Sequence, residues 1–454
     1  MSKIIKRIYI KTTAVLESPA IITAGEDFNT DKDINIDKKG NALIQGTAIA
    51  GIFRQYLAGE RQIKDEPQEL KELFGNDHNK TTDSTLSNIY ISDAYITTPK
   101  VGKRDGVKLE LFSKIALDKS KYDYEILYPG QEFEIKIEVI IREKHQKYEQ
   151  AFKNYLAQIL DGLMNSKITI GAKTSRGFGK IKVKTAPTIT ALDMTKKQDV
   201  ETWINFDWNT FKPNTTLQNL GTPIQNDQYI TIKTDLLIEK TLMIRSYAQD
   251  PNEESDYKHI TEEGKGIIPG TSWGGAFRHH LSKLLSDLNI AKYEKIIEEL
   301  FGYVDEKNKT ACKSSIIFEE SKITKARSLY MTRVKIDRFT SGAYDSALFN
   351  EIPNIGGETS LTIKIRKDKE KYIGLIIMAI QDLKSGIMSL GGETSIGRGT
   401  FTAIEIKTLT ENERKTFTAT KDSKLTIDGE FIKSEKETEY LQQAAELIMT
   451  AQEA

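Results

Sequence analysis

A short pattern able to hold a phosphate group occurs twice in the chain. It reads Gly-Thr-x3-Gly-x-Phe-Arg at residues 46–54 and 270–278, and it opens a run of apolar residues with helical spacing. The free amides of a helix N-terminus, with an arginine about two turns later, suit the phosphate of a nucleic-acid backbone. Ordinary helices packed by their glycines, with both arginines in solvent, are the alternative. The candidate phosphate-binding residues are Gly46, Thr47, Arg54, Gly270, Thr271 and Arg278.

Two stretches combine cations with aromatic rings. They read KVGKRDGVKLELFSK at residues 100–114 and MTRVKIDRFTSGAYDSALF at residues 331–349. Cations that pair with phosphates and rings that stack on bases suit a single RNA strand. A basic surface hairpin without a ligand is the alternative. The candidates are Lys103, Arg104 and Lys108 beside Phe112, and Arg333, Lys335 and Arg338 beside Phe339 and Tyr344.

Two glycine-rich loops, at residues 169–181 and 389–401, also bring backbone amides together with cations. Neither has the Gly-Lys-Ser/Thr ending of a nucleotide-binding loop, and the glycines precede a strand, so nucleoside triphosphate binding is disfavoured. A bulged hairpin that needs glycine for its dihedral angles is the alternative to an RNA contact. The candidate cations are Lys173, Arg176, Lys180 and Arg398.

The elements that must position these residues follow the same order in both halves of the chain. Residues 43–57 match residues 267–281, and residues 87–94 match residues 314–321. Alternating residues predict strands, and apolar residues at helical spacing predict helices. The order strand, helix, strand, strand, helix, strand is the ferredoxin-like plan, which RNA-recognition domains share. We therefore predict an α+β fold of two tandem domains.

We predict a first domain over residues 1–185, a connector over 186–225, a second domain over 226–410 and a C-terminal extension over 411–454 that ends in a helix. Thr47 and Thr271 are expected to cap the helices that follow them.

Composition excludes several classes of protein. The 454 residues carry equal numbers of basic and acidic side chains, so a nucleic-acid site must be a local patch. A single cysteine excludes an internal disulfide, and with five scattered histidines it argues against a structural zinc site. No apolar run reaches membrane-spanning length and the N-terminus lacks a signal-peptide core, so we expect a soluble, cytoplasmic protein with no membrane partner.

Together these motifs resemble the RAMP superfamily, and within it the backbone subunits of type III CRISPR effector complexes. The resemblance rests on LIQGTAIAGIFR, IIPGTSWGGAFR, the thumb-like stretch VKIDRFTSGAYDSALF and both glycine-rich loops. Two copies in one chain resemble the fused double-backbone subunits of type III-D-like systems. The resemblance implies ferredoxin-like domains with thumb-like insertions, which bind a guide RNA (crRNA) that pairs with target RNA. It also implies other effector-complex subunits as partners.

The resemblance further implies where an endoribonuclease site would lie. In the family, an aspartate in the loop ahead of the Gly-Ser/Thr motif cleaves the target RNA, and that place falls near Thr30 and Glu254. Neither is aspartate, but Asp31 and Asp33 adjoin the first position and Asp256 the second. A carboxylate beside a scissile phosphate can bind Mg²⁺ or another divalent ion, or align the attacking 2′-hydroxyl. A solvated acidic loop without chemistry is the alternative.

Three other functions compete with a cleaving guide-RNA-binding subunit. The first is a non-catalytic structural subunit of the same complex. The second is a guide-processing endoribonuclease that uses His279 and His280, although the first copy has Gln55 and Tyr56 at those places. The third is a scaffold that binds no RNA.

Overall fold

The computed structural model describes residues 2–23, 32–59, 65–76, 86–223, 228–247, 255–305, 308–403, 425–432 and 434–453. The chain forms two compact units. The first comprises residues 1–104, 122–174 and 178–227, and the second comprises residues 105–121, 175–177 and 228–454. Each unit has its own sheet and its own cluster of buried apolar side chains.

The sheet of the first unit is antiparallel, with the strand order β3-β7-β1-β8, and β9 also pairs with β1. Successive residues of the central strand β1 face opposite sides, so Ile8, Ile10 and Ala14 enter the core. The strands of this sheet are β1 (Ile4–Leu16), β3 (Ile89–Ile91), β7 (Glu132–Arg142), β8 (Ile181–Val183) and β9 (Thr188–Asp193). Two separate pairs are formed by β2 (Ala42–Ile44) with β4 (Ala94–Ile96), and by β5 (Val101–Leu109) with β6 (Ala116–Leu127).

Helices cover the apolar face of this sheet. Phe53 of α1 (Gly46–Ala58), Leu70 of α2 (Gln68–Phe74) and Leu156 of α3 (Glu149–Met164) are buried against the strand residues. A fully buried apolar side chain of this size contributes about 1.5–3 kcal/mol relative to an exposed one.

Residues 186–225, which we expected to form a connector, carry secondary structure of the first unit. β9 pairs with residues 6–11 of β1, and it is followed by α4 (Lys197–Ile204) and α5 (Leu217–Leu220). The ring of Phe206 stacks on Tyr9 of β1 at 3.9 Å between centroids. This segment is rich in Pro, Thr and Asn, and its aromatic residues have no regular spacing. The sequence therefore did not predict that it packs on the first unit.

The second unit repeats this arrangement. Its sheet has the order β18-β24-β10-β26-β27, and β25 also pairs with β10. The strands of this sheet are β10 (Tyr229–Ile238), β18 (Ile316–Phe318), β24 (Glu358–Arg366), β25 (Phe401–Ala403), β26 (Thr426–Ile427) and β27 (Glu430–Phe431). The helices α6 (Gly270–Asp287), α7 (Tyr293–Phe301) and α8 (Ile373–Lys384) cover it.

Individual side-chain hydrogen bonds, as well as whole helices and strands, recur in the two units. Ser87 Oγ lies 3.2 Å from the carbonyl oxygen of Leu73, and Ser314 Oγ lies 3.0 Å from that of Leu300. Each serine thus ties the end of a helix to the residues that precede the next strand of the unit's main sheet, β3 or β18. The prediction of an α+β fold with two repeated sheet-rich regions is confirmed.

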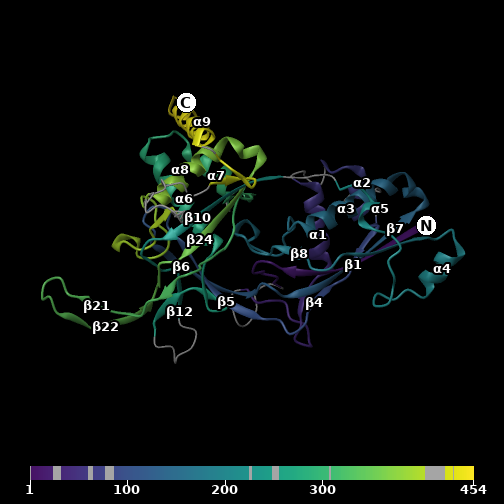
Figure 1. The fold of residues 1–454 in the computed structure, drawn as a ribbon, viewed down its shortest axis with the longest axis horizontal. Helices are drawn as coiled ribbons and strands as arrows, with labels where there is room; N and C mark the ends of the chain where they lie inside the picture. Colours follow the sequence, from purple (N-terminus) through teal and green to yellow (C-terminus); the bar gives the residue numbers. More distant parts are fainter. Residues whose placement is uncertain are drawn as a thin grey trace, which may run out of the picture. The chain divides into compact units, whose positions relative to one another are not determined.

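The second unit carries further short strands and a projecting hairpin. β21 (Met331–Ile336) and β22 (Ala343–Ile352) pair antiparallel and extend away from the body of the unit (Figure 1). In the other copy the corresponding stretch forms the two-stranded hairpin β5–β6. The remaining short strands are β11 (Thr241–Leu242), β12 (Arg245–Tyr247), β13 (Tyr257–His259), β14 (Thr261–Glu262), β15 (Lys265–Ile268), β16 (Tyr303–Asp305), β17 (Thr310–Cys312), β19 (Ser321–Lys322), β20 (Arg327–Ser328) and β23 (Asn354–Ile355).

The C-terminal helix α9 (Ser434–Glu453) packs against α8. Ala444 is buried in the core of the second unit, and Tyr440, Leu441 and Leu447 pack against that core. Gly374 of α8 leaves the space for this contact, because a Cβ there would overlap the carbonyl oxygen of Tyr440. The amphipathic pattern of α9 therefore serves packing within the unit.

Candidate nucleic-acid interface

The two repeated motifs begin helices at their glycines. α1 starts at Gly46 after Gln45, and α6 starts at Gly270 after Pro269. The prediction that Thr47 and Thr271 cap these helices is wrong, because both threonines lie within the first turn. Gly46 is required where the chain passes the neighbouring strand, since a Cβ would overlap the carbonyl oxygen of Ile91.

An amide that we considered for phosphate binding already has an anionic partner. The backbone N–H of Gly46 donates to Asp93 Oδ1 at 2.7 Å. A carboxylate at a helix N-terminus is stabilised by the unpaired amides and the helix dipole. A phosphate would therefore have to displace or share this contact.

Arg54 is engaged with a buried carboxylate. Its guanidinium donates to Glu66 through Nη2 at 2.7 Å and Nε at 3.1 Å, and to the carbonyl oxygen of Gly75 through Nη1 at 3.1 Å. Glu66 is almost fully buried. Because a buried carboxylate needs a partner, Arg54 is held in place by the fold of the first unit.

Arg278, at the same place in the second motif, has a different environment. Within the described part of the chain, no hydrogen bond or ion pair engages its guanidinium. Burial lowers the pKa of Arg278, while the charge of Glu298 acts in the opposite direction. A partly buried cation without a close partner gains from an incoming anion. Of the two repeated arginines, Arg278 is therefore the one available to a phosphate.

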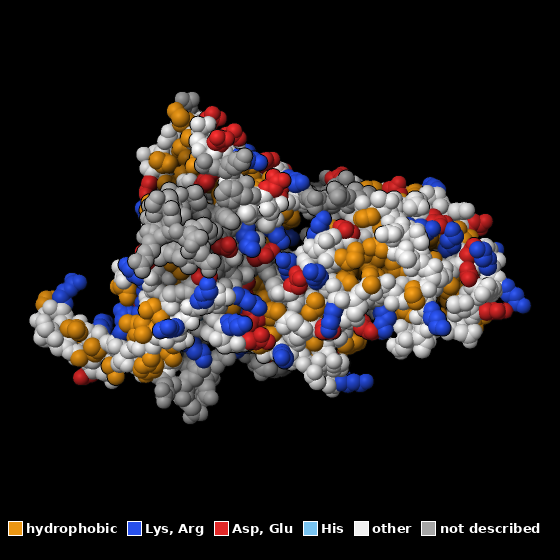
Figure 2. Space-filling model, in the orientation of Figure 1, with side chains coloured by type: hydrophobic (Ala, Val, Ile, Leu, Met, Phe, Trp, Pro, Cys, Tyr) orange, Lys and Arg blue, Asp and Glu red, His pale blue; other side chains and the backbone are white. Residues whose placement is uncertain are grey.

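The hairpin β21–β22 exposes the strongest combination of basic and apolar side chains. Phe339 at its tip is 94% exposed and Tyr344 is 45% exposed. Lys335 lies 4.9 Å from the centroid of the Tyr344 ring. Arg338 is exposed next to Phe339. Figure 2 shows hydrophobic and basic side chains together along this projection.

The side chain of Asp337 organises the turn at the tip of this hairpin. The backbone N–H groups of Phe339 and Thr340 donate to Asp337 Oδ1 at 2.9 and 2.8 Å. The hydrogen bond from the Thr340 amide, with further bonds from Tyr344 and Phe339, lowers the pKa of Asp337 to about 2. Phe339 is thus presented on a defined turn.

An ionic network lies at the base of the same hairpin. Arg333 Nη1 is 2.7 Å from Glu393 and 3.4 Å from Glu351, and the buried Arg398 pairs with both carboxylates. Burial raises the pKa of Glu351, but its contacts with Arg398 and Arg333 outweigh this, so the net pKa is lowered. Arg333 and Arg398 therefore join the hairpin to the second glycine-rich loop.

The cations of the first basic stretch divide between internal contacts and the surface. Lys103 pairs with Asp123 at 2.5 Å. Arg104 is buried and lies over the ring of Phe178, 5.4 Å from its centroid. Lys108 and Phe112 are exposed.

The glycine-rich loops have structural reasons for their glycines. Gly179 and Gly399 have φ of 73° and 71°, and a Cβ at either would overlap the carbonyl oxygen of Ile170 or Leu390. In the first loop the ammonium group of Lys173 lies 3.4 Å from the ring centroid of Tyr124. Arg176 and Lys180 in the same loop are partly exposed.

The acidic candidates lie in different settings. Asp31, and the reference positions Thr30 and Glu254, lie outside the described residues. Asp33 is 8% exposed. Asp256 is exposed, and its Oδ2 accepts the backbone N–H of Asn350 at 2.7 Å. The described segments contain no group of three Asp, Glu, His or Cys side chains that could hold a metal ion.

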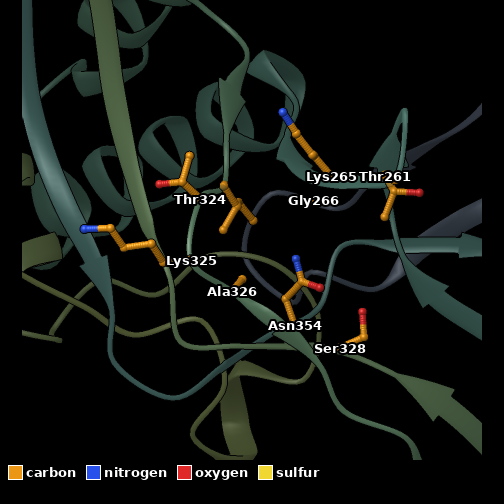
Figure 3. Close-up of a pocket in the computed structure, with 10 residues that line it drawn as sticks. Thr261, Lys265, Gly266, Thr324, Lys325, Ala326, Ser328 and Asn354 are labelled. Atoms are coloured by element: carbon orange, nitrogen blue, oxygen red, sulfur yellow. The ribbon is translucent and has the colours of Figure 1, made fainter.

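Sequence reasoning missed the partners that decide which cations are available. No sequence pattern marked Glu66, Glu351 and Glu393 as partners of the arginines, because their pairing depends on distant segments meeting in the fold. Asn354 was also missed; it is buried in a pocket of the second unit (Figure 3).

The fold and this surface define a tandem α+β protein with an exposed basic and aromatic hairpin. The sequence profile of the RAMP superfamily matches residues 13–182 and 229–402. The chain belongs to the RAMP superfamily. This membership suggests a CRISPR-associated RNA-binding subunit that functions in a multi-subunit complex. No curated protein matches the chain. Among the described residues, no helix has the length and apolar character needed to cross a membrane.

Proposed function

We propose that this protein is a guide-RNA-binding backbone subunit of a type III CRISPR ribonucleoprotein, with two backbone domains fused in one chain. The observation that carries the proposal is the hairpin β21–β22, whose tip exposes Phe339 beside Arg338 and Lys335. Exposed aromatic and basic groups on a projecting element gain contacts when they meet RNA.

Each half is proposed to be a ferredoxin-like domain. The matching strand orders β3-β7-β1-β8 and β18-β24-β10-β25 support this, because both follow the antiparallel order of that plan. The ferredoxin-like cores are proposed to lie within residues 1–185 and 226–410, to which β9, α4 and α5 are added in the first unit and α9 in the second. On this basis β5–β6 and β21–β22 are the thumb-like insertions of the two copies.

In the proposed complex, Phe339 wedges against a base of the guide RNA. Arg338 and Lys335 contact the neighbouring phosphates, and Arg278 contacts a further phosphate. Phosphate contacts position RNA without reading its sequence, which suits a subunit that must accept many guides. The net charge of 0 agrees with binding through such local groups.

The test is to express the protein with a CRISPR array and its neighbouring subunits and to sequence the RNA that co-purifies. We expect RNAs of uniform length that carry repeat-derived sequence. The variant F339A combined with R338A should recover less RNA, while K197A, an exposed lysine on α4, should recover as much as the unchanged protein. RNA without array sequence, or no RNA, would refute the proposal.

Cleavage of target RNA is a second proposed activity of the same complex. Asp256 supports it, because its carboxylate is exposed and is oriented by the Asn350 amide. The described residues do not by themselves assemble a Mg²⁺ site, so no step through a metal ion is derived. Cleavage measured with and without a chelator, for the unchanged protein and for D256A, tests this activity.

A further inference from the structure

Each glycine-rich loop contacts the hairpin of its own copy through the same loop position. The residue two places after Gly171 is Lys173, and the residue two places after Gly391 is Glu393. Their φ angles are 57° and 60°. Residues other than glycine seldom adopt this left-handed conformation, and they keep it where surrounding contacts hold them. Both copies therefore fix a charged side chain at this position, but the two charges are opposite.

In the first unit, the loop and the hairpin are joined by cations and aromatic rings. The ammonium group of Lys173 lies 3.4 Å from the ring centroid of Tyr124 and 4.7 Å from that of Tyr122, both on β6. Arg104 of β5 lies over the ring of Phe178 in the loop. Because these rings are neutral, a dissolved anion does not take their place.

In the second unit, ion pairs replace these contacts. The Glu393 carboxylate lies 2.7 Å from Nη1 of Arg333 on β21 and 2.9 Å from Nη2 of Arg245 on β12. Arg398 stands at the loop position of Phe178, and its Nη1 lies 2.9 Å from Glu393. Glu393 therefore connects the loop to the base of the hairpin β21–β22.

Burial divides this network into an inner pair and an accessible part. The side chains of Arg398 and Glu351 are 5% and 0% exposed, and they neutralise each other. Those of Arg245 and Arg333 are 39% and 31% exposed, and they share the carboxylate of Glu393. These two accessible cations exceed that carboxylate by one charge, so a divalent anion would balance them.

Aromatic rings hold the two accessible arginines independently of Glu393. The guanidinium of Arg245 lies 4.5 Å from the ring centroid of Tyr257, and that of Arg333 lies 5.5 Å from the ring centroid of Phe349. The two rings stack on each other with their centroids 6.1 Å apart. A stacked guanidinium keeps its N–H donors at its edge for an anion. The arginines are therefore arranged for an anion before it arrives.

We propose that Glu393 is a latch that fixes the base of the hairpin β21–β22, and that a divalent anion of the phosphate class opens it by replacing the Glu393 carboxylate between Arg245 and Arg333. Arg398 then keeps Glu351 as its partner. The hairpin β5–β6 does not respond to the anion, because rings and cations join it to its loop. The latch belongs to the free protein and does not depend on the proposed binding of guide RNA.

Hydrogen–deuterium exchange of the full-length protein without RNA tests the latch, in phosphate and chloride buffers of equal ionic strength. The exchange rate of a backbone amide reports how often its segment opens locally. In phosphate, residues 331–334 and 348–351, which pair at the base of β21–β22, should exchange about tenfold faster, the change expected when a hydrogen bond to a charged group is lost. Residues 101–105 and 122–127, at the base of β5–β6, should exchange equally in both buffers.

Three variants identify the groups responsible. E393Q should give fast exchange at the base of β21–β22 even in chloride, because glutamine has the same size but no charge to hold the arginines. R245M removes one cation of the anion site and keeps the contact between Arg333 and Glu393, so it should reduce the difference between the buffers. K325M is the matched control. It breaks an ion pair with Glu358 in the same unit and should behave as the unchanged protein.

Three results would overturn the latch: equal exchange of β21–β22 in phosphate and chloride, unchanged exchange of E393Q in chloride, or faster exchange of both hairpins in phosphate. The comparison of buffers uses the unchanged protein and therefore needs no variant to fold. The unfolding temperatures of E393Q and R245M establish that these variants are folded.

Discussion

At the scale of single residues, Arg54 and Arg278 occupy one motif position but have different partners. Arg54 neutralises the buried Glu66, while Arg278 has no close anionic partner among the described residues. The same residue type at the same repeat position therefore serves the stability of one copy and is open to a ligand in the other.

We predict that R278A weakens the binding of single-stranded RNA regardless of its sequence. Loss of one phosphate contact should lower the slope of log affinity against log salt by about 0.7 for a single strand. R54A should instead lower the free energy of unfolding by about 3 kcal/mol, because it leaves Glu66 buried and unpaired. RNA affinity at several salt concentrations and urea unfolding measure the two effects.

The double variant R54A/E66Q is the control for Arg54, since it removes the uncompensated charge and should recover part of the stability. A loss of RNA affinity in R54A without any loss of stability would contradict this division. If the slope of log affinity against log salt is unchanged in R278A, Arg278 makes no phosphate contact and only supports the fold.

At the scale of elements, the hairpin β21–β22 combines a defined turn with an uncovered ring. Phe339 makes almost no contact within the unit because it is 94% exposed. We predict that F339A leaves the unfolding temperature unchanged but weakens RNA binding by about 1–3 kcal/mol, the usual loss when one base loses its stacking partner. Fluorescence anisotropy with labelled RNA measures the affinity.

F112A is the matched variant, because Phe112 lies in the corresponding stretch of the other copy and is also exposed. If both hairpins contact RNA, the two losses should be similar. Equal RNA affinity of F339A and the unchanged protein would contradict the proposed contact between Phe339 and a base of the guide RNA.

The strand β13 carries a histidine that should make the second unit sensitive to acid. His259 Nδ1 accepts the N–H of Ile244 at 3.1 Å, and Nε2 lies 3.0 Å from the carbonyl oxygen of Ile267. Burial, opposed by weaker effects of backbone hydrogen bonds with Ile267 and Leu242, lowers the pKa of His259 to about 4. The neutral ring, protonated on Nε2, fits both contacts.

We predict that stability falls as the pH decreases from about 6.5 toward 4, because only the unfolded chain takes up this proton in that range. The contribution is present above the unfolded pKa and amounts to roughly 3 kcal/mol for a shift of this size. Urea unfolding against pH measures it. H259Q should flatten the slope, although His145 and His279, whose pKa values burial also lowers, will leave part of it. If the free energy of unfolding depends on pH to the same extent in H259Q, His259 is not the group responsible for the loss of stability in acid.

At the scale of the whole molecule, two copies of one fold would present two acidic loops to different segments of a bound target RNA. We predict that D256A removes one cleavage product and that D31A/D33A removes another, while target binding is retained. A catalytic carboxylate stabilises the transition state more than the bound ground state. Gel analysis of the products formed by the assembled complex, together with RNA affinity, measures both effects.

Loss of product from only one of the two variants would make the other copy structural. Unchanged products in both would contradict cleavage and leave a guide-binding scaffold.

The sequence by itself determined the duplication, the α+β class and the order of the main elements. These follow from local patterns: alternating residues make half-buried strands such as β1, and Gly179 and Gly399 recur where φ is positive. The cap positions lie two residues before the expected threonines, at Gln45 and Pro269, because close packing at Gly46 and Gly270, rather than capping propensity, sets where these helices begin.

Only the tertiary structure decided which candidate side chains remain available to a ligand. Arg398 is buried because Glu351, from a distant strand, lies against it, and Asn354 loses solvent because β23 packs beside Gly266. Likewise, the aromatic segment after β9 belongs to the first unit because Phe206 stacks on Tyr9. Such contacts join residues far apart in sequence, so no local spacing encodes them, and the charge and burial of each site depend on which segments the fold brings together.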